Sequence, residues 1–323
     1  MLFRLEPLRF SFVAREAIHF PAGKSGNILR GAFGTIFRRI ACLPQCSNAD
    51  TCANRLTCPY ARLFEPSATT VAGSSPGPSG LADHPRPFVF RAIHLDGKTF
   101  GVNQTFHFDL NLFDTDPTTI AYLILAFAQL AREGLGPERR KVQLISVCKR
   151  DLEDNPTSLI YKDGLIQNQS DVSPLTLDLE ATTEQRISHI RVKFVTPTEL
   201  KSGQQIAARP EFAIVATRAR DRISTLRELY DPTGAGALPI DFRGFGERAA
   251  LVKMTRCRIQ NVDIERRSTR TGQTHSIGGF IGEAEYEGEL DEFVPYLRAA
   301  KWTGIGRQTV WGKGEIEIFL ERS

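Results

Sequence analysis

The segment Thr105-Phe-His-Phe-Asp-Leu-Asn-Leu-Phe113, with the Asp116-Pro117 pair that follows it, decides the fold of the first half of this chain. Apolar and polar residues alternate through the segment. This alternation predicts a strand with phenylalanine and leucine on one face and histidine, aspartate and asparagine on the other. Asp116 and Pro117 suit the N-cap and first position of a helix, and Gly134 suits its end. The segment therefore predicts a strand followed by a buried apolar helix.

Patterns on both sides of this segment extend it into a complete structural unit. Alternation predicts further strands near 2–14, 88–94 and 142–149, and apolar residues at helical spacing predict a helix near 27–40. This β-α-β-β-α-β order is that of the ferredoxin-like unit. Because the pattern restarts in the second half, we expect an α+β fold of two tandem ferredoxin-like (RRM-like) βαββαβ domains, with a cysteine-bearing insertion in the first.

The domain boundaries follow from these patterns and from local composition. We place an N-terminal ferredoxin-like domain at 1–150, a polar extension or linker at 151–185 and a C-terminal ferredoxin-like domain at 186–323. Within the first domain, 42–66 form the cysteine-bearing insertion. Residues 67–87 are rich in serine, glycine, proline and alanine, which predicts a mobile loop.

The composition is that of an ordinary soluble protein, with 41% hydrophobic and 24% charged residues. The longest apolar run, 120–128, is too short to span a bilayer, and the N-terminus does not have the pattern of a signal peptide. We therefore expect a cytoplasmic protein with no membrane partner. The formal net charge is +4, and the surplus lies in residues 186–323, which is consistent with nucleic-acid binding by that half.

A glycine-rich loop lies near the C-terminus, in the segment Gly304-Ile-Gly-Arg-Gln-Thr-Val-Trp-Gly-Lys-Gly314. Glycine allows close approach of backbone amides to a ligand, and successive amides can form a concave anion site. Arg307 and Lys313 suit phosphate, and the absence of a GK[ST] motif followed by a helix excludes a nucleotide P-loop. The loop therefore favours a sugar-phosphate backbone as its ligand. The alternative is a tight turn that closes a sheet.

Further segments extend this pattern into a family resemblance. The glycine-rich loop, the basic segment Arg266-Arg-Ser-Thr-Arg270 and the segment Ile277-Gly-Gly-Phe-Ile-Gly282 together resemble the C-terminal domain of the CRISPR repeat-RNA-processing endoribonucleases of the RAMP superfamily. Leu29-Arg-Gly-Ala-Phe-Gly34 and Phe64-Glu-Pro66 in the first half are also similar to that family. The resemblance covers most of the chain, in the same order.

The resemblance implies a protein that binds CRISPR repeat RNA and cuts the precursor (pre-crRNA) without a catalytic metal. In this family the upstream 2′-hydroxyl attacks the adjacent phosphate, which leaves a 2′,3′-cyclic phosphate and a 5′-hydroxyl. Many members place a catalytic histidine at the start of the first helix, whereas this chain has no histidine between Asn27 and Ala41. An alternative is therefore a non-cleaving RAMP subunit that binds guide RNA with other CRISPR effector subunits.

Candidate catalytic residues supply a base, an acid and cations for this reaction. Two histidines and three cations near the family's catalytic region or the basic segment are the candidates: His19, His275, Lys24, Arg30 and Arg38. His94 and His107 receive no role, because His94 lies near a strand end and His107 lies on a polar face where we expect it to be solvated.

Candidate RNA-binding residues lie in the second half of the chain. The predicted strand 189–194 places Arg191 and Lys193 on one outer face, although such cations can also serve only to discourage aggregation. The full set of candidates is Arg191, Lys193, Arg266, Arg267, Arg270, Lys301, Gly304, Gly306, Arg307, Gln308, Thr309, Gly312, Lys313 and Gly314.

Four cysteines in the insertion form a candidate metal site: Cys42, Cys46, Cys52 and Cys58. Four thiolates are a sufficient shell for a structural zinc ion, although the spacing lacks the usual C-x2-C pair. An iron–sulfur cluster and unliganded thiols stay open as alternatives. A second functional alternative is accordingly a cysteine-cluster metal or redox protein that does not bind RNA.

Overall fold

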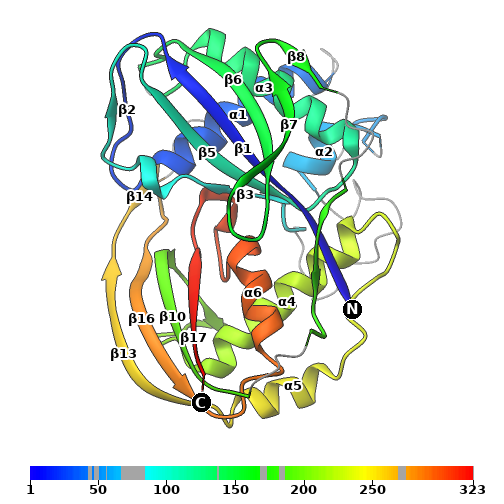
Figure 1. Cartoon of the computed structure of the whole chain (residues 1–323), viewed down its shortest axis with the longest axis vertical. Helices are drawn as coiled ribbons and strands as arrows, with labels where there is room; N and C mark the ends of the chain where they lie inside the picture. Colours follow the sequence, from blue (N-terminus) through cyan, green and yellow to red (C-terminus); the bar gives the residue numbers. More distant parts are fainter. Residues whose placement is uncertain are drawn as a thin grey trace. The chain divides into compact units, whose positions relative to one another are not determined.

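The computed structural model describes residues 1–42, 46, 51–55, 57–66, 84–136, 138–167, 173–181, 186–267 and 274–322. The chain divides into two compact units (Figure 1). The N-terminal unit consists of Arg4–Leu175 and Thr225–Ala237, and the C-terminal unit consists of Met1–Phe3, Thr176–Ser224 and Leu238–Ser323. Most of the predicted mobile loop 67–87 lies outside the described residues.

The N-terminal unit contains an antiparallel sheet in the order β3-β5-β1-β6-β7-β8. The strand β9 (Leu175–Asp178), which lies at the chain boundary of the two units, also pairs with β1. Its strands are β1 (Leu2–Ala14), β3 (Phe88–Arg91), β5 (Thr105–Leu112), β6 (Val142–Arg150), β7 (Pro156–Lys162) and β8 (Leu165–Ile166). A small separate ladder joins β2 (Ile18–His19) to β4 (Thr99–Phe100).

The described part of this unit includes the helices α1 (Ser25–Ala41), α2 (Pro59–Phe64) and α3 (Pro117–Glu133), and a 3-10 turn, η1 (Ile93–Leu95), follows β3. Figure 1 shows α1 and α3 on one face of the sheet. Phenylalanines fill the space between these layers, and Phe33 of α1 stacks on Phe127 of α3 with ring centroids 5.1 Å apart.

The caps of α3 are those that its sequence predicts. Asp116 accepts a hydrogen bond from the Thr118 amide at 2.9 Å, and Pro117 occupies the first turn. Gly134 then ends the helix with a φ of 112°, a conformation that favours glycine.

The C-terminal unit contains a sheet in the order β13-β16-β10-β17, with α4 (Phe212–Tyr230) and α6 (Val294–Thr303) on one face (Figure 1). The strands are β10 (Ile187–Thr198), β13 (Lys253–Val262), β16 (Gly279–Glu287) and β17 (Ile316–Arg322). The shorter elements are β11 (Lys201–Ser202), β12 (Gln205–Ile206), α5 (Phe242–Ala249), β14 (Glu265–Arg267), β15 (Thr274–Ser276) and η2 (Thr309–Trp311).

The two principal sheets have the same topology. Counting the strands of each β-α-β-β-α-β unit in chain order, both sheets run second, third, first, fourth, which is the ferredoxin-like arrangement. The predicted α+β fold of tandem ferredoxin-like units is therefore confirmed. The sequence patterns missed α5 and the short β2–β4 ladder. No helix in the described part of the chain has both the length and the apolar character needed to cross a membrane.

Candidate active site

The cations predicted to stabilise charge near α1 lie far apart. Lys24 immediately precedes the helix and Arg38 lies in its last turn. A rise of about 1.5 Å per residue separates their backbones by roughly 20 Å. Arg30 lies over the ring of Phe64 at 4.5 Å, and Arg38 donates from Nη2 to the Cys46 carbonyl oxygen at 3.3 Å. The structure therefore does not gather these three side chains at one point, and their catalytic role stays a prediction.

His19 is exposed on the short β2 strand, opposite Thr99 of β4. Its Nδ1 shares a hydrogen bond with Thr99 Oγ1 at 2.9 Å. The bond restrains one ring nitrogen and leaves Nε2 for a substrate. This geometry is compatible with proton transfer, and the predicted role of His19 stays open.

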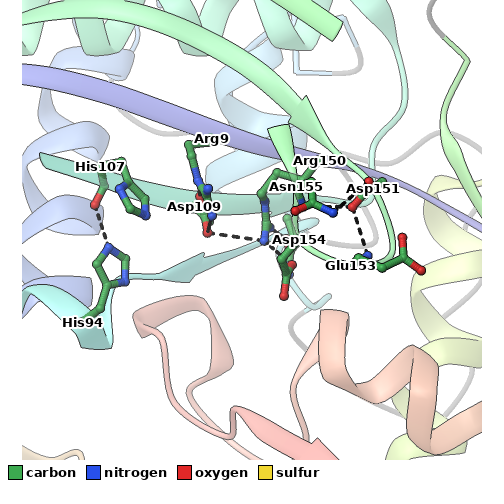
Figure 2. Close-up of polar contacts among 10 residues, drawn as sticks. Arg9, His94, His107, Asp109, Arg150, Asp151, Glu153, Asp154 and Asn155 are labelled. Carbon is green, nitrogen blue, oxygen red and sulfur yellow. Dashed lines mark hydrogen bonds and ion pairs between the residues drawn. The ribbon is translucent and has the colours of Figure 1, made fainter. Parts of the chain in front are cut away.

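A pair of histidines, to which the sequence patterns gave no role, is formed by His94 of η1 and His107 of β5. The rings of His94 and His107 stack with centroids 4.6 Å apart and an angle of 28° between their planes. His94 donates from Nε2 to the His107 carbonyl oxygen at 2.8 Å, as Figure 2 shows. Because a carbonyl can only accept, this bond assigns the proton to Nε2 and leaves Nδ1 as the acceptor nitrogen of a neutral ring.

His107 is half-buried, in contrast to the solvated side chain that alternation predicts. Burial, followed by the nearby His94 and Arg9, lowers the pKa of His107 to about 4 from its ordinary value of 6.5. The His107 ring is therefore neutral at physiological pH. A neutral aromatic ring at this position can hold the orientation of His94 without opposing a positive charge on it.

An arginine–carboxylate network lies beside the histidine pair on the same face of the sheet (Figure 2). The register of β1 against β5 places Arg9 opposite Asp109. Arg9 binds this carboxylate through two hydrogen bonds, from Nε at 2.7 Å and from Nη2 at 2.9 Å. Arg150 of β6 approaches the same carboxylate at 3.3 Å and donates to Asn111 Oδ1 at 2.6 Å. Two guanidinium groups thus share one buried aspartate.

A tight turn after β6 completes this network. Asp151 accepts hydrogen bonds from the amides of Glu153 at 3.0 Å and Asn155 at 2.8 Å. The turn presents Asp154, whose Oδ1 accepts from Arg150 Nη1 at 2.7 Å. Arg150 is consequently held between two carboxylates, with little freedom to reorient.

The glycines of the C-terminal loop permit close contacts within the C-terminal unit. A β-carbon at Gly306 would lie 2.3 Å from the Glu199 carbonyl oxygen, and one at Gly314 would lie 2.0 Å from the Ile305 carbonyl oxygen. The amides of Ile305, Arg307 and Gly314 donate to backbone carbonyl groups of the same unit at 2.9 to 3.1 Å. Close packing therefore accounts for glycine at positions 306 and 314. The same contacts occupy backbone amides that were expected to bind an anion.

The side chains of this loop differ in their exposure. Arg307 is half exposed and forms an ion pair with Glu199, whereas Thr309 and Lys313 are buried. Lys301 lies 5.3 Å from the ring centroid of Trp302. Gly304, Gln308 and Gly312 adopt positive φ angles between 62° and 79°. The structure accounts for the shape of the loop, and RNA binding by its residues stays a prediction.

The outer face of β10 carries both signs of charge. Arg191 pairs with Glu283 of β16 at 3.2 Å and lies 4.0 Å from the ring centroid of Phe319, and Lys193 pairs with Glu317 of β17 at 2.9 Å. Glutamates of the two neighbouring strands therefore flank the cations, so this face is not the uniformly basic surface that the strand alone suggested. Binding of RNA by Arg191 and Lys193 stays untested.

The basic segment forms part of the β14–β15 hairpin. The backbone register places Arg266 opposite His275 and Arg267 opposite Thr274. Arg270 lies outside the described residues. The hairpin therefore brings one predicted catalytic residue and one predicted RNA-binding residue to the same register position.

The cysteine cluster does not form a metal site in this structure. Burial, together with the neighbouring thiols of Cys58 and Cys46, raises the pKa of Cys42 to about 12. The described ranges include all four cysteines of the cluster. Within these ranges, no group of three or more His, Cys, Asp or Glu side chains is arranged to hold a metal ion. The predicted structural zinc is therefore not supported.

Comparisons with known proteins bear on both halves of the chain. Residues 3–172 match the family described as the AF_1859_N N-terminal domain, and residues 192–316 match the family described as CRISPR-associated endoribonuclease Cas6. No curated protein sequence matches the chain.

Solved structures share the fold at low sequence identity. A Cas6 product complex is 16% identical with a TM-score of 0.56, over 98% of this chain and 99% of that one. Thermus thermophilus Cas6 is 15% identical with a TM-score of 0.53, over 98% of both chains. A partial Cas6-RT-Cas1–Cas2 complex is 10% identical with a TM-score of 0.54, over 98% of this chain and 46% of that one.

Proposed function

Because this chain belongs to the Cas6-like family of CRISPR repeat-processing proteins, we propose that it binds CRISPR repeat RNA and cleaves pre-crRNA as an endoribonuclease. The observation that carries the proposal is the match of residues 192–316 to the Cas6 endoribonuclease family. The shared strand order of the two units supports it, since similar structures of Cas6 proteins extend over nearly the whole chain.

The reaction needs no metal ion. The 2′-hydroxyl upstream of the cut loses its proton to a base, and its oxygen forms a bond to the adjacent phosphorus. The bond from phosphorus to the 5′ oxygen breaks, and that oxygen takes up a proton. The products are a 2′,3′-cyclic phosphate and a 5′-hydroxyl. Cations stabilise the charge that develops on the phosphorane, while a histidine suits proton transfer near neutral pH.

The candidate RNA contacts lie on the loop and hairpin of the C-terminal unit. Arg307 is exposed enough to reach a phosphate, and its ion pair with Glu199 is on the surface, where exchange for a phosphate costs little. The β14–β15 hairpin carries Arg266 and Arg267. We propose that the protein acts in the cytoplasm on repeat RNA, alone or with other CRISPR effector subunits.

The test is incubation of the purified protein with end-labelled repeat RNA in EDTA. A matched RNA carries a single 2′-deoxy nucleotide at the scissile position. We expect one cut with a cyclic phosphate end, and no cut in the 2′-deoxy RNA. Cleavage of the 2′-deoxy RNA, or cleavage that requires a divalent cation, would contradict the proposed mechanism.

A second candidate function is a non-cleaving subunit that binds guide RNA. The specific observation in its favour is that α1, from Ser25 to Ala41, contains no histidine. This candidate predicts salt-dependent binding of repeat RNA with no product in the same assay. The cleavage gel and a filter-binding titration on the same samples therefore distinguish the two functions.

A further inference from the structure

We propose that His94 is a catalytic residue of the RNA cleavage, accepting the 2′-hydroxyl proton at Nδ1, and that His107 positions it. The inference rests on the proposed function and assigns the base of that reaction. The O2′–P bond forms as the proton moves to His94, the P–O5′ bond breaks, and the 5′ oxygen takes a proton from water. His94 then returns its proton to solvent.

The His94 ring is held in a geometry that suits a general base. The hydrogen bond from His94 Nε2 to the His107 carbonyl holds the imidazole in the tautomer that a base requires, with the lone pair on Nδ1. When Nδ1 takes a proton, the Nε2–H bond to a carbonyl oxygen strengthens, because the donor becomes charged. His94 is half-buried, so its ring is restrained and still open to solvent.

The stacked histidine pair differs from the other described histidines. Among the residues whose side chains the structure describes, His94 and His107 are the only histidines whose rings contact each other. His19 shares its Nδ1 with Thr99, and His189 lies 3.1 Å from Glu321 on the outer face of β10. Neither of these has a ring whose tautomer is assigned by a backbone carbonyl.

Charged side chains surround the histidine pair. Arg9 and Arg150 face it from β1 and β6, and Asp109 faces it from β5. Arg9 donates from Nε and Nη2 to Asp109, and within the described residues Nη1 makes no hydrogen bond. A phosphate beside His94 can therefore approach a guanidinium whose position the aspartate fixes. This is the cation that a phosphorane requires.

The test compares single-turnover cleavage of repeat RNA by the 323-residue protein and three variants in EDTA, with RNA affinity measured in parallel. We expect H94Q to reduce the cleavage rate by about 10²- to 10⁴-fold and to keep its RNA affinity within about threefold. The control E138Q removes an exposed carboxylate outside the candidate sites and should cleave at the wild-type rate. H19Q tests the rival assignment, and a loss in H19Q with none in H94Q would overturn the inference.

His107 is tested by its own pair of variants. H107F retains an aromatic ring under His94 and should keep most of the activity, while H107A should lose at least about tenfold in rate. Because His107 is neutral near pH 7, the cleavage rate of H107F should depend on pH in the same way as the cleavage rate of the wild-type protein. Equal, wild-type rates in H107F and H107A would overturn the positioning role. Circular dichroism of each variant separates these losses from unfolding.

The outcomes also separate this inference from the proposed function. If the wild-type protein cleaves and H94Q cleaves equally well, only the assignment of His94 is wrong. If the wild-type protein binds repeat RNA without cutting it, the endoribonuclease function fails and the assignment fails with it.

Discussion

Gly34 of α1 and Phe64 of α2 lie so close that a β-carbon on Gly34 would be 2.2 Å from Phe64 Cζ. The aromatic ring is confined on its other sides, since Arg30 lies over it at 4.5 Å and Tyr60 stacks on it at 5.4 Å. This contact explains two of the segments that carried the family resemblance. Gly34 and Phe64 are needed together because they dock α2 onto α1.

The first prediction is that Gly34→Ala lowers the free energy of unfolding by about 1–3 kcal/mol, because the new methyl group overpacks the contact with Phe64. Gly31 is the matched control in the same helix, since a β-carbon there would meet nothing within 4 Å. Gly31→Ala should stabilise the protein by up to about 1 kcal/mol through helix propensity. Urea denaturation of both variants measures the difference, and equal midpoints would contradict the packing argument.

The second prediction concerns the buried carboxylate at Asp109. Asp109→Ala leaves Arg9 and Arg150 without the anion they share, so we expect a loss of about 3–5 kcal/mol in the free energy of unfolding. Glu138 is the control, because its ion pair with Arg140 is exposed. Glu138→Ala should cost less than about 1 kcal/mol. A loss for Asp109→Ala as small as that of the control would show that the network contributes little to stability.

The third prediction is a pH dependence that originates at His107. Its folded pKa of about 4 is below the ordinary value of 6.5, so the unfolded chain binds this proton more readily. The contribution of His107 to stability is therefore fully present above pH 6.5 and is lost as pH falls toward 4. Because the group is only half-buried, solvent screening limits the loss to about 1–2 kcal/mol.

His107→Phe isolates this contribution from that of the carboxylates that titrate in the same range. The variant should lose about 1–2 kcal/mol less stability than the wild type between pH 7 and pH 4.5. Urea denaturation at the two pH values gives the comparison. Parallel losses in the two proteins would mean that His107 is not buried as the structure describes.

The fourth prediction separates the packing role of the glycine-rich loop from RNA binding. Gly306 has a φ of 76° and no room for a β-carbon, so Gly306→Ala should cost about 2–4 kcal/mol. Gly203 has a φ of 59° with open space around it, and Gly203→Ala should cost only the backbone strain of about 1 kcal/mol. Thermal unfolding checks both.

Arg307→Ala completes this test, because Arg307 is half exposed and its only described side-chain ion pair is the one with Glu199. It should leave the melting temperature nearly unchanged, weaken RNA binding and reduce the slope of log affinity against log salt by about 1. An unchanged slope would assign Arg307 to the packing of the loop.

Local patterns in the sequence predict the secondary structure well where the residues that indicate a helix or a strand lie a few positions apart. The Asp116 cap and the Gly134 stop bound α3, as predicted. The alternation in β10 matches its burial, with Ile190 and Phe194 in the core and Lys193 exposed. These features depend on near neighbours along the chain, so they can be predicted without knowledge of the tertiary contacts.

The alternation in β5 shows the limit of such patterns. It indicated that His107 and Asp109 share a face, and it did not reveal that this face is half-buried or what lies against it. Alternation alone predicts that a histidine on a polar face is exposed to solvent, and only the neighbouring strands can show that it is buried. The signal for the site was visible in the sequence, whereas the identity of its partners was not.

Tertiary structure alone decided which side chains meet. Arg9 reaches Asp109 across 100 residues because β1 pairs with β5 in one register, and a shift of a single residue would turn Arg9 to the other face. The same holds for His94, which η1 places on His107, and for Gly306, whose need for glycine arises from the distant Glu199. Periodicity is set by local backbone geometry. Register and packing are set by the whole chain, and the candidate site depends on them.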